Sequence, residues 1–318
     1  MSQQLAIEPA LIQDSRQVLA THARSFQWAS VFLPSAARDD AAVVYAFCRL
    51  VDDLADEAPS TSIAKADLTQ VRAELEGHLP PRPLVRAYVD LCRVRGIPMG
   101  AATSLLDGVE SDLEPVCFED DGELLRYCYQ VAGTVGLMMC GVLGVSDPRA
   151  IAPAIDLGIA MQLTNICRDI REDAGRGRTY VPANRLRTAG TTPQALVTGE
   201  PDRVALSHVT DDLLHMADIY YRSARNGLRF IPWRARLAIT VASGVYRAIG
   251  HKLRRTGSDP WVGRTIVGPL GKVLATARAV FTFITPNVQG WSGFRAHRAS
   301  LHRQLQGLPG ATQDEVTS

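Results

Sequence analysis

Two apolar helical stretches of this chain are each interrupted by acidic side chains at helical spacing, and this pattern restricts what the chain can fold into. The first stretch, residues 45–56, reads YAFCRLVDDLAD. Its polar positions at i, i+4, i+7 and i+11 are Tyr45, Arg49, Asp52 and Asp56. At about 100° of rotation per residue, they lie within about 60° of one another on a helix. Asp53 and Glu57 lie off this stripe and are predicted to be solvated.

The second stretch follows an almost uncharged run, IAPAIDLGIAMQLTNIC, which predicts a buried helix. Charge then begins abruptly, with Arg168, Asp169, Arg171, Glu172 and Asp173. Asn165, Asp169 and Asp173 fall on a stripe about 80° wide. Three oxygen-bearing side chains therefore line one wall of the predicted helix.

Carboxylates one turn apart on an apolar helix repel each other and lose hydration unless a cation compensates them. Mg²⁺ fits such a site, because it prefers oxygen ligands and completes its shell with water and substrate phosphate. In the alternative interpretation, Asp169 and Asp173 are solvated surface acids paired with Arg168 and Arg171, as charges at helical spacing commonly are. The presence of two such stripes favours the metal site, because two helices facing each other would enclose a cavity with a carboxylate pair on each side.

At these residues the chain resembles the squalene and phytoene synthases, the head-to-head condensing enzymes of isoprenoid metabolism. The matching segments are HARSF at 22–26, CRLVDDLAD at 48–56, SDLEP at 111–115, YCYQVAGTVGLMM at 127–139 and QLTNICRDIREDAGRGRTYVP at 162–182. The resemblance runs from about residue 15 to about residue 255 and implies the all-α class I isoprenoid synthase fold. We therefore expect a single helical domain over residues 1–318, with both acidic motifs at the mouth of a central cavity.

The resemblance also implies roles for individual side chains. Mg²⁺, or alternatively Mn²⁺, would be held by Asp52, Asp56, Asn165, Asp169 and Asp173. A substrate diphosphate would contact His22, Ala23, Arg24, Ser25, Tyr45, Arg49, Gln162, Arg168 and Tyr246. The residues expected to take part in the chemistry are Tyr45, Arg49, Tyr127, Arg168 and Tyr246, with Tyr127 near the reacting carbons.

Several of these segments also have plainer interpretations. Residues 22–25 could form an ordinary polar connection, and Tyr246 could be a half-buried core tyrosine. Arg176 and Arg178 follow the second motif in a glycine-containing loop, which could act as a lid over the phosphates or stay solvated. The acids of the SDLEP region are predicted to face solvent; they are Asp107, Glu110 and Asp112.

In the family that this chain resembles, one prenyl diphosphate ionises and the double bond of a second one attacks the allylic cation. We expect geranylgeranyl diphosphate as the substrate, a cyclopropyl (prephytoene) diphosphate as the intermediate and phytoene, a carotenoid precursor, as the product. The alternatives are a squalene, dehydrosqualene or presqualene diphosphate synthase acting on farnesyl diphosphate, and a non-catalytic assembly factor of the same fold. A terpene cyclase is disfavoured, because many cyclases use DDxxD. No GxGxxG follows a predicted strand, and NADPH is not expected, although squalene synthases of the family bind it without that motif.

Composition and charge exclude several other classes of protein. A net charge of +1 lacks the strongly basic footprint of a nucleic-acid-binding protein. The six cysteines show no CxxC spacing, which predicts reduced thiols, and the seven histidines form no paired ligand pattern, so no transition-metal site is predicted. The first residues lack the basic start and apolar core of a secretory signal, and we expect a cytoplasmic protein.

Helical patterns run through most of the chain and predict about ten to twelve helices with no strand. Residues 127–146 carry no charge, a length that raises the question of a membrane span. We interpret them as a central helix that lines an apolar pocket, with glycines that leave room for a polyprenyl tail or allow close helix packing. Residues 183–200 are predicted to be a polar connection.

The C-terminal extension, residues 256–318, is basic. Residues 251–318 hold nine Lys or Arg against three acids, a net charge of +6. Trp291 and Phe294 accompany this charge, a combination typical of peripheral contact with anionic lipid on the inner face of a membrane. A solvated basic tail is the alternative interpretation.

Overall fold

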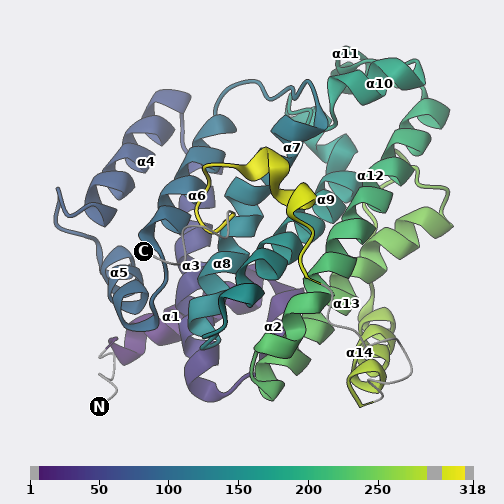
Figure 1. The fold of residues 1–318 in the computed structure, drawn as a ribbon. Coiled ribbons are helices and arrows are strands. Elements are labelled where there is room, and N and C mark those ends of the chain that lie inside the picture. Colours follow the sequence, from purple (N-terminus) through teal and green to yellow (C-terminus); the bar gives the residue numbers. More distant parts are fainter. Residues whose placement is uncertain (1–6, 285–295, 312–318) are drawn as a thin grey trace.

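The computed structural model describes residues 7–284 and 296–311, and their architecture is all-α (Figure 1). Within these ranges no strand forms, and one isolated bridge joins Cys117 to Thr179. The helices are α1 (Pro9–His22), α2 (Arg24–Ser30), α3 (Ser35–Asp56), α4 (Thr61–Leu75), α5 (Pro83–Arg95), α6 (Met99–Ser111), α7 (Asp121–Cys128), α8 (Thr134–Val142), α9 (Ile151–Gly175), α10 (Ala183–Ala189), α11 (Pro193–Val197), α12 (Arg203–Ala224), α13 (Trp233–Arg255) and α14 (Pro269–Ile284). The predicted fold class is confirmed.

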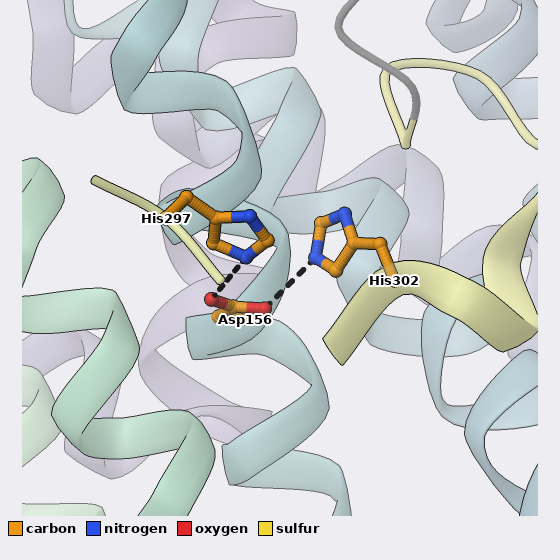
Figure 2. A group of neighbouring side chains, drawn as sticks. All are labelled: Asp156, His297 and His302. Carbon is orange, nitrogen blue, oxygen red and sulfur yellow. Dashed lines mark hydrogen bonds and ion pairs between the residues drawn. The ribbon is translucent and has the colours of Figure 1, made fainter. Parts of the chain in front are cut away.

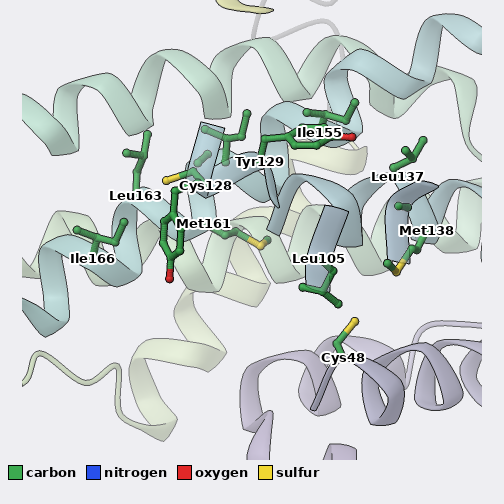
Figure 3. Close-up of a cluster of buried hydrophobic side chains, with 14 of the residues drawn as sticks. Cys48, Leu105, Cys128, Tyr129, Leu137, Met138, Ile155, Met161, Leu163 and Ile166 are labelled. Atoms are coloured by element: carbon green, nitrogen blue, oxygen red, sulfur yellow. The ribbon is translucent and has the colours of Figure 1, made fainter. Parts of the chain in front are cut away.

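The longest helix, α9, forms the axis of the bundle and packs against α8, α12 and α13. The run Pro148–Gly175 is apolar and long enough to cross a membrane by composition, but 61% of its most apolar window is buried inside the protein. Such burial is typical of the core helix of a water-soluble protein. Figure 3 shows side chains from α9 meeting those of neighbouring helices, among them Ile155, Leu163 and Ile166.

The uncharged run that the sequence singled out is a continuous helical path with a wider turn in the middle. It comprises the end of α7, the π-helical turn η1 (Tyr129–Gly133) and α8, and it ends at Val142. Two glycines let this path approach α9 closely. A Cβ on Gly136 would lie 2.2 Å from the carbonyl oxygen of Ala154, and one on Gly158 would lie 2.1 Å from that of Ala132. These glycines therefore serve close helix packing, and both also line the cavity described below.

Local capping explains where several helices begin. Ser60, after the break that ends α3, accepts a hydrogen bond from the backbone N–H of Ile63 and caps α4. Asp202 caps α12 by accepting from the N–H groups of Val204 and Ala205. These capping residues set where α4 and α12 begin.

The prediction of a polar connection at residues 183–200 was wrong. This segment contains α10 and α11, and Thr192 caps α11 through the N–H of Ala195. Short helices of this kind lack a long apolar period, so the hydrophobic pattern did not reveal them. They also explain part of the difference between the predicted ten to twelve helices and the fourteen α-helices found in residues 7–284 and 296–311.

The C-terminal extension takes two different paths. Helix α14 lies along α13, and a 3₁₀ turn, η5 (Ala299–Leu305), crosses the other side of the bundle next to α7 and α9 (Figure 1, yellow). His302 and Leu305 of this turn are buried, and His302 faces Asp156 of α9 (Figure 2). The turn η5 is therefore not part of a solvated tail. Trp291 and Phe294 lie outside the described residues.

Candidate active site

One cavity of about 350 Å³ runs between α2, α3, η1, α8, α9 and α13. Most of its wall is apolar, with Phe26, Leu33, Val135, Met139, Leu157 and Met161 among the lining residues. Its polar lining residues include Tyr45, Asp52, Gln162, Asn165 and Tyr246. The cavity therefore combines a long apolar surface with polar side chains from α3, α9 and α13.

On α3, Asp52 lines the cavity and Asp56 lies at the exposed end of the helix. Burial, together with the charges of Asp56 and Asp53, raises the pKa of Asp52 to about 7, although Arg49 acts in the opposite direction. Arg49 forms an ion pair with Asp53 and lies 3.8 Å from Glu57. Asp53 and Glu57 were predicted to be solvated. Glu57 is exposed, as predicted, whereas Asp53 is half-buried and pairs with Arg49.

The loop after α9 closes onto the end of α3. Arg178 donates to Asp56 over 3.0 Å and is partly buried, whereas Arg176 pairs with Glu172 over 3.2 Å on the surface. Sequence analysis left the same two interpretations open for Arg176 and Arg178, and their positions in the structure differ. Arg178 belongs to the acid-lined region, and Arg176 is solvated.

On α9, Asn165 and Asp173 are half-buried along the predicted stripe. The Oδ1 atom of Asn165 is buried with no hydrogen-bond partner, while its amide group donates to Gln162 over 3.4 Å. Burial and the charges of Asp169 and Glu172 raise the pKa of Asp173 to about 7. This wall therefore has one buried oxygen atom without a donor, on Asn165, and a carboxylate crowded by like charge, on Asp173.

Asp169 is the exception on this wall, because two arginines hold it. Arg168 donates to it from Nε over 2.8 Å, and Arg264 lies 3.0 Å away, from the loop after α13. The expected pairing with Arg168 is present, but Asp169 is 15% exposed at its side chain and is not a free surface acid. Arg171 contacts no acid of the stripe and donates to the carbonyl oxygen of Trp261 over 3.0 Å. Nothing in the sequence near residue 264 indicated the contact between Arg264 and Asp169.

Tyr45 of α3 and Tyr246 of α13 both line the cavity. Burial raises the pKa of Tyr246, whose hydroxyl lies within electrostatic reach of Arg168 and Asp169. Burial likewise raises the pKa of Tyr45 to about 12, with Tyr246 and Asp52 among its neighbours. Tyr246 is half-buried, as the plainer interpretation expected, and it also lines the cavity.

The predicted diphosphate-binding turn joins α1 to α2. His22 ends α1 and is exposed, Ala23 is buried, and Ser25 is half-buried in α2. Arg24 begins α2. The described side chains of His22, Ala23 and Ser25 do not line the cavity, but Phe26 does, and its ring lies 5.3 Å from that of Tyr246.

Tyr127 does not reach the cavity lining. Its hydroxyl donates to Asp112 over 2.8 Å, and Tyr180 donates to the other oxygen of Asp112 over 2.9 Å. Burial raises the pKa of Asp112, which lies close enough to Asp52 to raise the pKa of that acid as well. The prediction that Asp112 faces solvent was therefore wrong, and its place within the SDLEP match was the available signal. Asp107 and Glu110 do lie near the surface, beside Arg72.

The residues of this region fit a hard divalent cation. Asp52 and Asp173 are carboxylates whose pKa values are raised to about 7 by burial and like charge, and the carbonyl oxygen of Asn165 is buried without a partner. All of these candidate ligand atoms are oxygens, the type that Mg²⁺ and Mn²⁺ prefer. A cation here would supply the charge that these groups lack.

Comparison with known proteins identifies the family of this chain. The profile of the squalene/phytoene synthase family matches residues 19–272. The chain belongs to the squalene/phytoene synthase family. It is 36% identical over 302 residues to a phytoene synthase of Pseudescherichia vulneris, covering 89% of this chain and 97% of that protein. It is 38% identical over 254 residues to a 15-cis-phytoene synthase of Enterobacter agglomerans, covering 76% and 85% of the two chains.

A solved structure extends the comparison to the fold. A crystal structure of a dehydrosqualene synthase in complex with a ligand superposes with a TM-score of 0.78 at 26% identity, and the match covers 87% of this chain and 97% of that one. The squalene/phytoene synthase family thus accounts for the all-α bundle and for the resemblance found in the sequence. That resemblance is confirmed.

Proposed function

We propose that this protein is a phytoene synthase, which joins two geranylgeranyl diphosphates head to head in two successive steps and releases one diphosphate and one proton in each step. The observation that carries the proposal is one cavity whose wall is apolar and whose polar lining includes Asp52 of α3 and Asn165 of α9. An apolar wall suits the hydrocarbon chain of the substrate. The acids at the polar end suit a metal ion that would bind its diphosphate. The phytoene synthases among the relatives favour this product.

The residues that would hold the metal are Asp52, Asp56, Asn165, Asp169 and Asp173. Mg²⁺ bound there would neutralise the negative charge that develops on the diphosphate leaving group. Mn²⁺ has similar ligand preferences and is the expected substitute.

The chain's own donors orient the diphosphate. Arg168 and Tyr246 lie next to each other at the polar end, and Arg49 is anchored by Asp53 one turn along α3. Charged donors form the stronger hydrogen bonds to phosphate oxygens, so these groups bind the leaving group in place. Ser25 and His22, at the α1–α2 turn, would contact the second diphosphate.

The apolar wall protects the reactive intermediate. An allylic cation reacts with water, and the cavity surrounds the hydrocarbon chain with side chains such as Phe26, Leu157 and Met161. Excluding water lets the double bond of the second substrate attack the cation. Loss of a proton without reduction ends the reaction at phytoene, so NADPH is not required.

Diphosphate release tests the role of the acids. We expect Asp52→Asn and Asp169→Asn to lower the rate of diphosphate release at least about a hundredfold, because each removes a charge from the site. The control is Asp107→Asn, on the outer face of α6, where the acid pairs with Arg72. Near-normal release from the two site variants would contradict the proposal and favour a binding or assembly role.

We also propose that the protein works in the cytoplasm and that α14 contacts the membrane surface peripherally. The exposed apolar residues Leu270, Leu274 and Phe281 follow one stripe of α14, and the charged residues of that helix are the basic Lys272 and Arg278. A groove of about 550 Å³ between α13 and α14 is lined by further basic residues, among them Lys252 and Arg255, with no acid. An apolar stripe flanked by basic charge fits anionic lipid.

Vesicle co-sedimentation tests this contact. We expect the protein to bind phosphatidylglycerol vesicles and not phosphatidylcholine vesicles, and Leu270→Ser with Leu274→Ser to weaken binding at least about tenfold. Leu79→Ser, at a leucine that is 43% exposed outside α14, is the control. Equal binding by all variants, or dimer formation through α14 without vesicle binding, would contradict the membrane contact.

A further inference from the structure

A buried cluster of one carboxylate and two imidazoles joins the C-terminal segment to the central helix, outside the cavity. Asp156 of α9 is 0% exposed, and its two oxygens face different histidines (Figure 2). His302 Nε2 lies 2.8 Å from Oδ1, and His297 Nε2 lies 3.0 Å from Oδ2. Burial alone would raise the pKa of Asp156, but the hydrogen bonds from both histidines hold it below its usual value. The carboxylate is therefore ionised.

The surroundings of His302 fix its protonation. Its Nδ1 lies 3.1 Å from the carbonyl oxygen of Ala311, while its Nε2 faces Asp156. A carbonyl oxygen and an ionised carboxylate can only accept hydrogen bonds, so the ring must donate from both nitrogens. His302 is then an imidazolium, and its charge balances the buried Asp156.

Hydrogen bonding explains these distances better than a metal ion does. Zinc binds histidine nitrogen and carboxylate oxygen at about 2.0–2.2 Å, and tetrahedral ligands at that radius lie about 3.3 Å apart. The N···O distances to Asp156, 2.8 Å from His302 and 3.0 Å from His297, are shorter than this ligand separation. The two nitrogens also face separate oxygens of Asp156. They match the lengths of ordinary N–H···O bonds.

The cluster holds a segment that we call the C-terminal strap, residues 296–311. Tyr220 of α12 donates to the carbonyl oxygen of Leu301 over 2.9 Å, and Arg126 of α7 donates to that of Gln304 over 3.1 Å. Tyr129 donates to the carbonyl oxygen of Pro309. The apolar side chains that the strap adds to the core are Leu305, Leu308 and Ala311.

The strap covers the outer face of the two helices whose inner faces line the cavity. On α9, Ala154 and Leu157 line the cavity, whereas Ile151 lies against the strap at Gly310. On α8, Val135 and Met139 line the cavity, and Leu137 lies against the same glycine. One layer of helix therefore separates the strap from the cavity.

We propose that Asp156 and the imidazolium of His302 fasten the strap, and that the fastened strap positions α8 and α9 as the cavity wall. Asp156 and His302 are positioning residues, because neither lines the cavity. The link to the hydrocarbon chain of the substrate rests on the proposed function, whereas the fastening itself does not. The expected consequence of unfastening is a wall that tolerates substrates of a different length.

Hydrogen exchange of His302→Gln measures the fastening without substrate. We expect the strap amides of Leu301, Leu308 and Ala311 to exchange at least about tenfold faster than in the unaltered protein, with α4 and α5 unchanged. His208→Gln, the same substitution at an exposed position of α12, should leave exchange unchanged. Unchanged strap exchange in His302→Gln would overturn the fastening.

Substrate selectivity measures the positioning. We expect His302→Gln to change the ratio of kcat/KM for geranylgeranyl and farnesyl diphosphates by at least about threefold, because the wall that discriminates between them loosens. Faster strap exchange with an unchanged ratio would overturn the positioning role. Absence of activity in the unaltered protein would instead contradict the proposed function, and exchange would still decide the fastening.

The unaltered protein provides a test that needs no variant, should His302→Gln fail to fold. Nitrogen NMR at neutral pH should show both ring nitrogens of His302 protonated, since both face acceptors. A neutral tautomer would overturn the proposal. So would about one equivalent of tightly bound transition metal in protein purified without a metal-affinity tag.

Discussion

The two acids whose pKa values are raised to about 7, Asp52 and Asp173, dominate the electrostatics of the site. Because these values exceed those of an unfolded chain, the folded protein binds extra protons, and the stability gained at low pH is lost as pH rises through about 7. In metal-free buffer we expect the free energy of unfolding to fall from pH 6 to pH 8, by about 1 kcal/mol more than in the Asp52→Asn, Asp173→Asn double variant. Denaturant unfolding at both pH values measures this difference, and equal pH dependence would contradict the crowding of these acids.

At the same scale, the sequence predicted more of the site than of its surroundings. Helical spacing placed Asp52 and Asn165 on the predicted stripes, because a period of 3.6 is a local property. Both side chains line the cavity, whereas Asp56, Asp169 and Asp173 do not. The partners of Asp112 and Asp169 could not be predicted in this way. Tyr180 and Arg264 reach these acids from loops, and no local pattern encodes where a loop returns.

Among the elements, the contact between η1, α8 and α9 should be the least tolerant of added volume. Gly158→Ala places a methyl group 2.1 Å from the carbonyl oxygen of Ala132, and we expect it to destabilise the protein by about 1–3 kcal/mol. Gly175→Ala, in the same helix, meets nothing within 4 Å and should be neutral or slightly stabilising. Thermal unfolding of both variants checks the difference, and equal melting temperatures would contradict the close packing.

Elements with long apolar periods were predicted well, and short or irregular ones were not. The helix α9 followed from its uncharged run, whereas α10, α11 and the strap have few apolar positions each. The strap is held by Asp156, which is far away in sequence from His297 and His302. The search of the sequence for metal-ligand spacing did not find this cluster, because its three side chains are joined by hydrogen bonds and come from distant segments.

For the whole molecule, the expectation of one domain over residues 1–318 stays a prediction, while the all-α class is confirmed. The distribution of charge is also a property of this scale. The net charge of +1 conceals a basic C-terminal region, and α14 presents that charge next to an exposed apolar stripe. Composition alone therefore could not distinguish a solvated basic tail from the proposed peripheral membrane contact.

The identity of the hydrocarbon product tests the central claim most directly. The purified protein is incubated with Mg²⁺ and either geranylgeranyl or farnesyl diphosphate, with and without NADPH, and the extract is analysed by mass spectrometry. We predict phytoene from geranylgeranyl diphosphate, in equal yield with and without NADPH, and no product after chelation of Mg²⁺. Squalene formed from farnesyl diphosphate only when NADPH is present, or no hydrocarbon under any condition, would contradict the account.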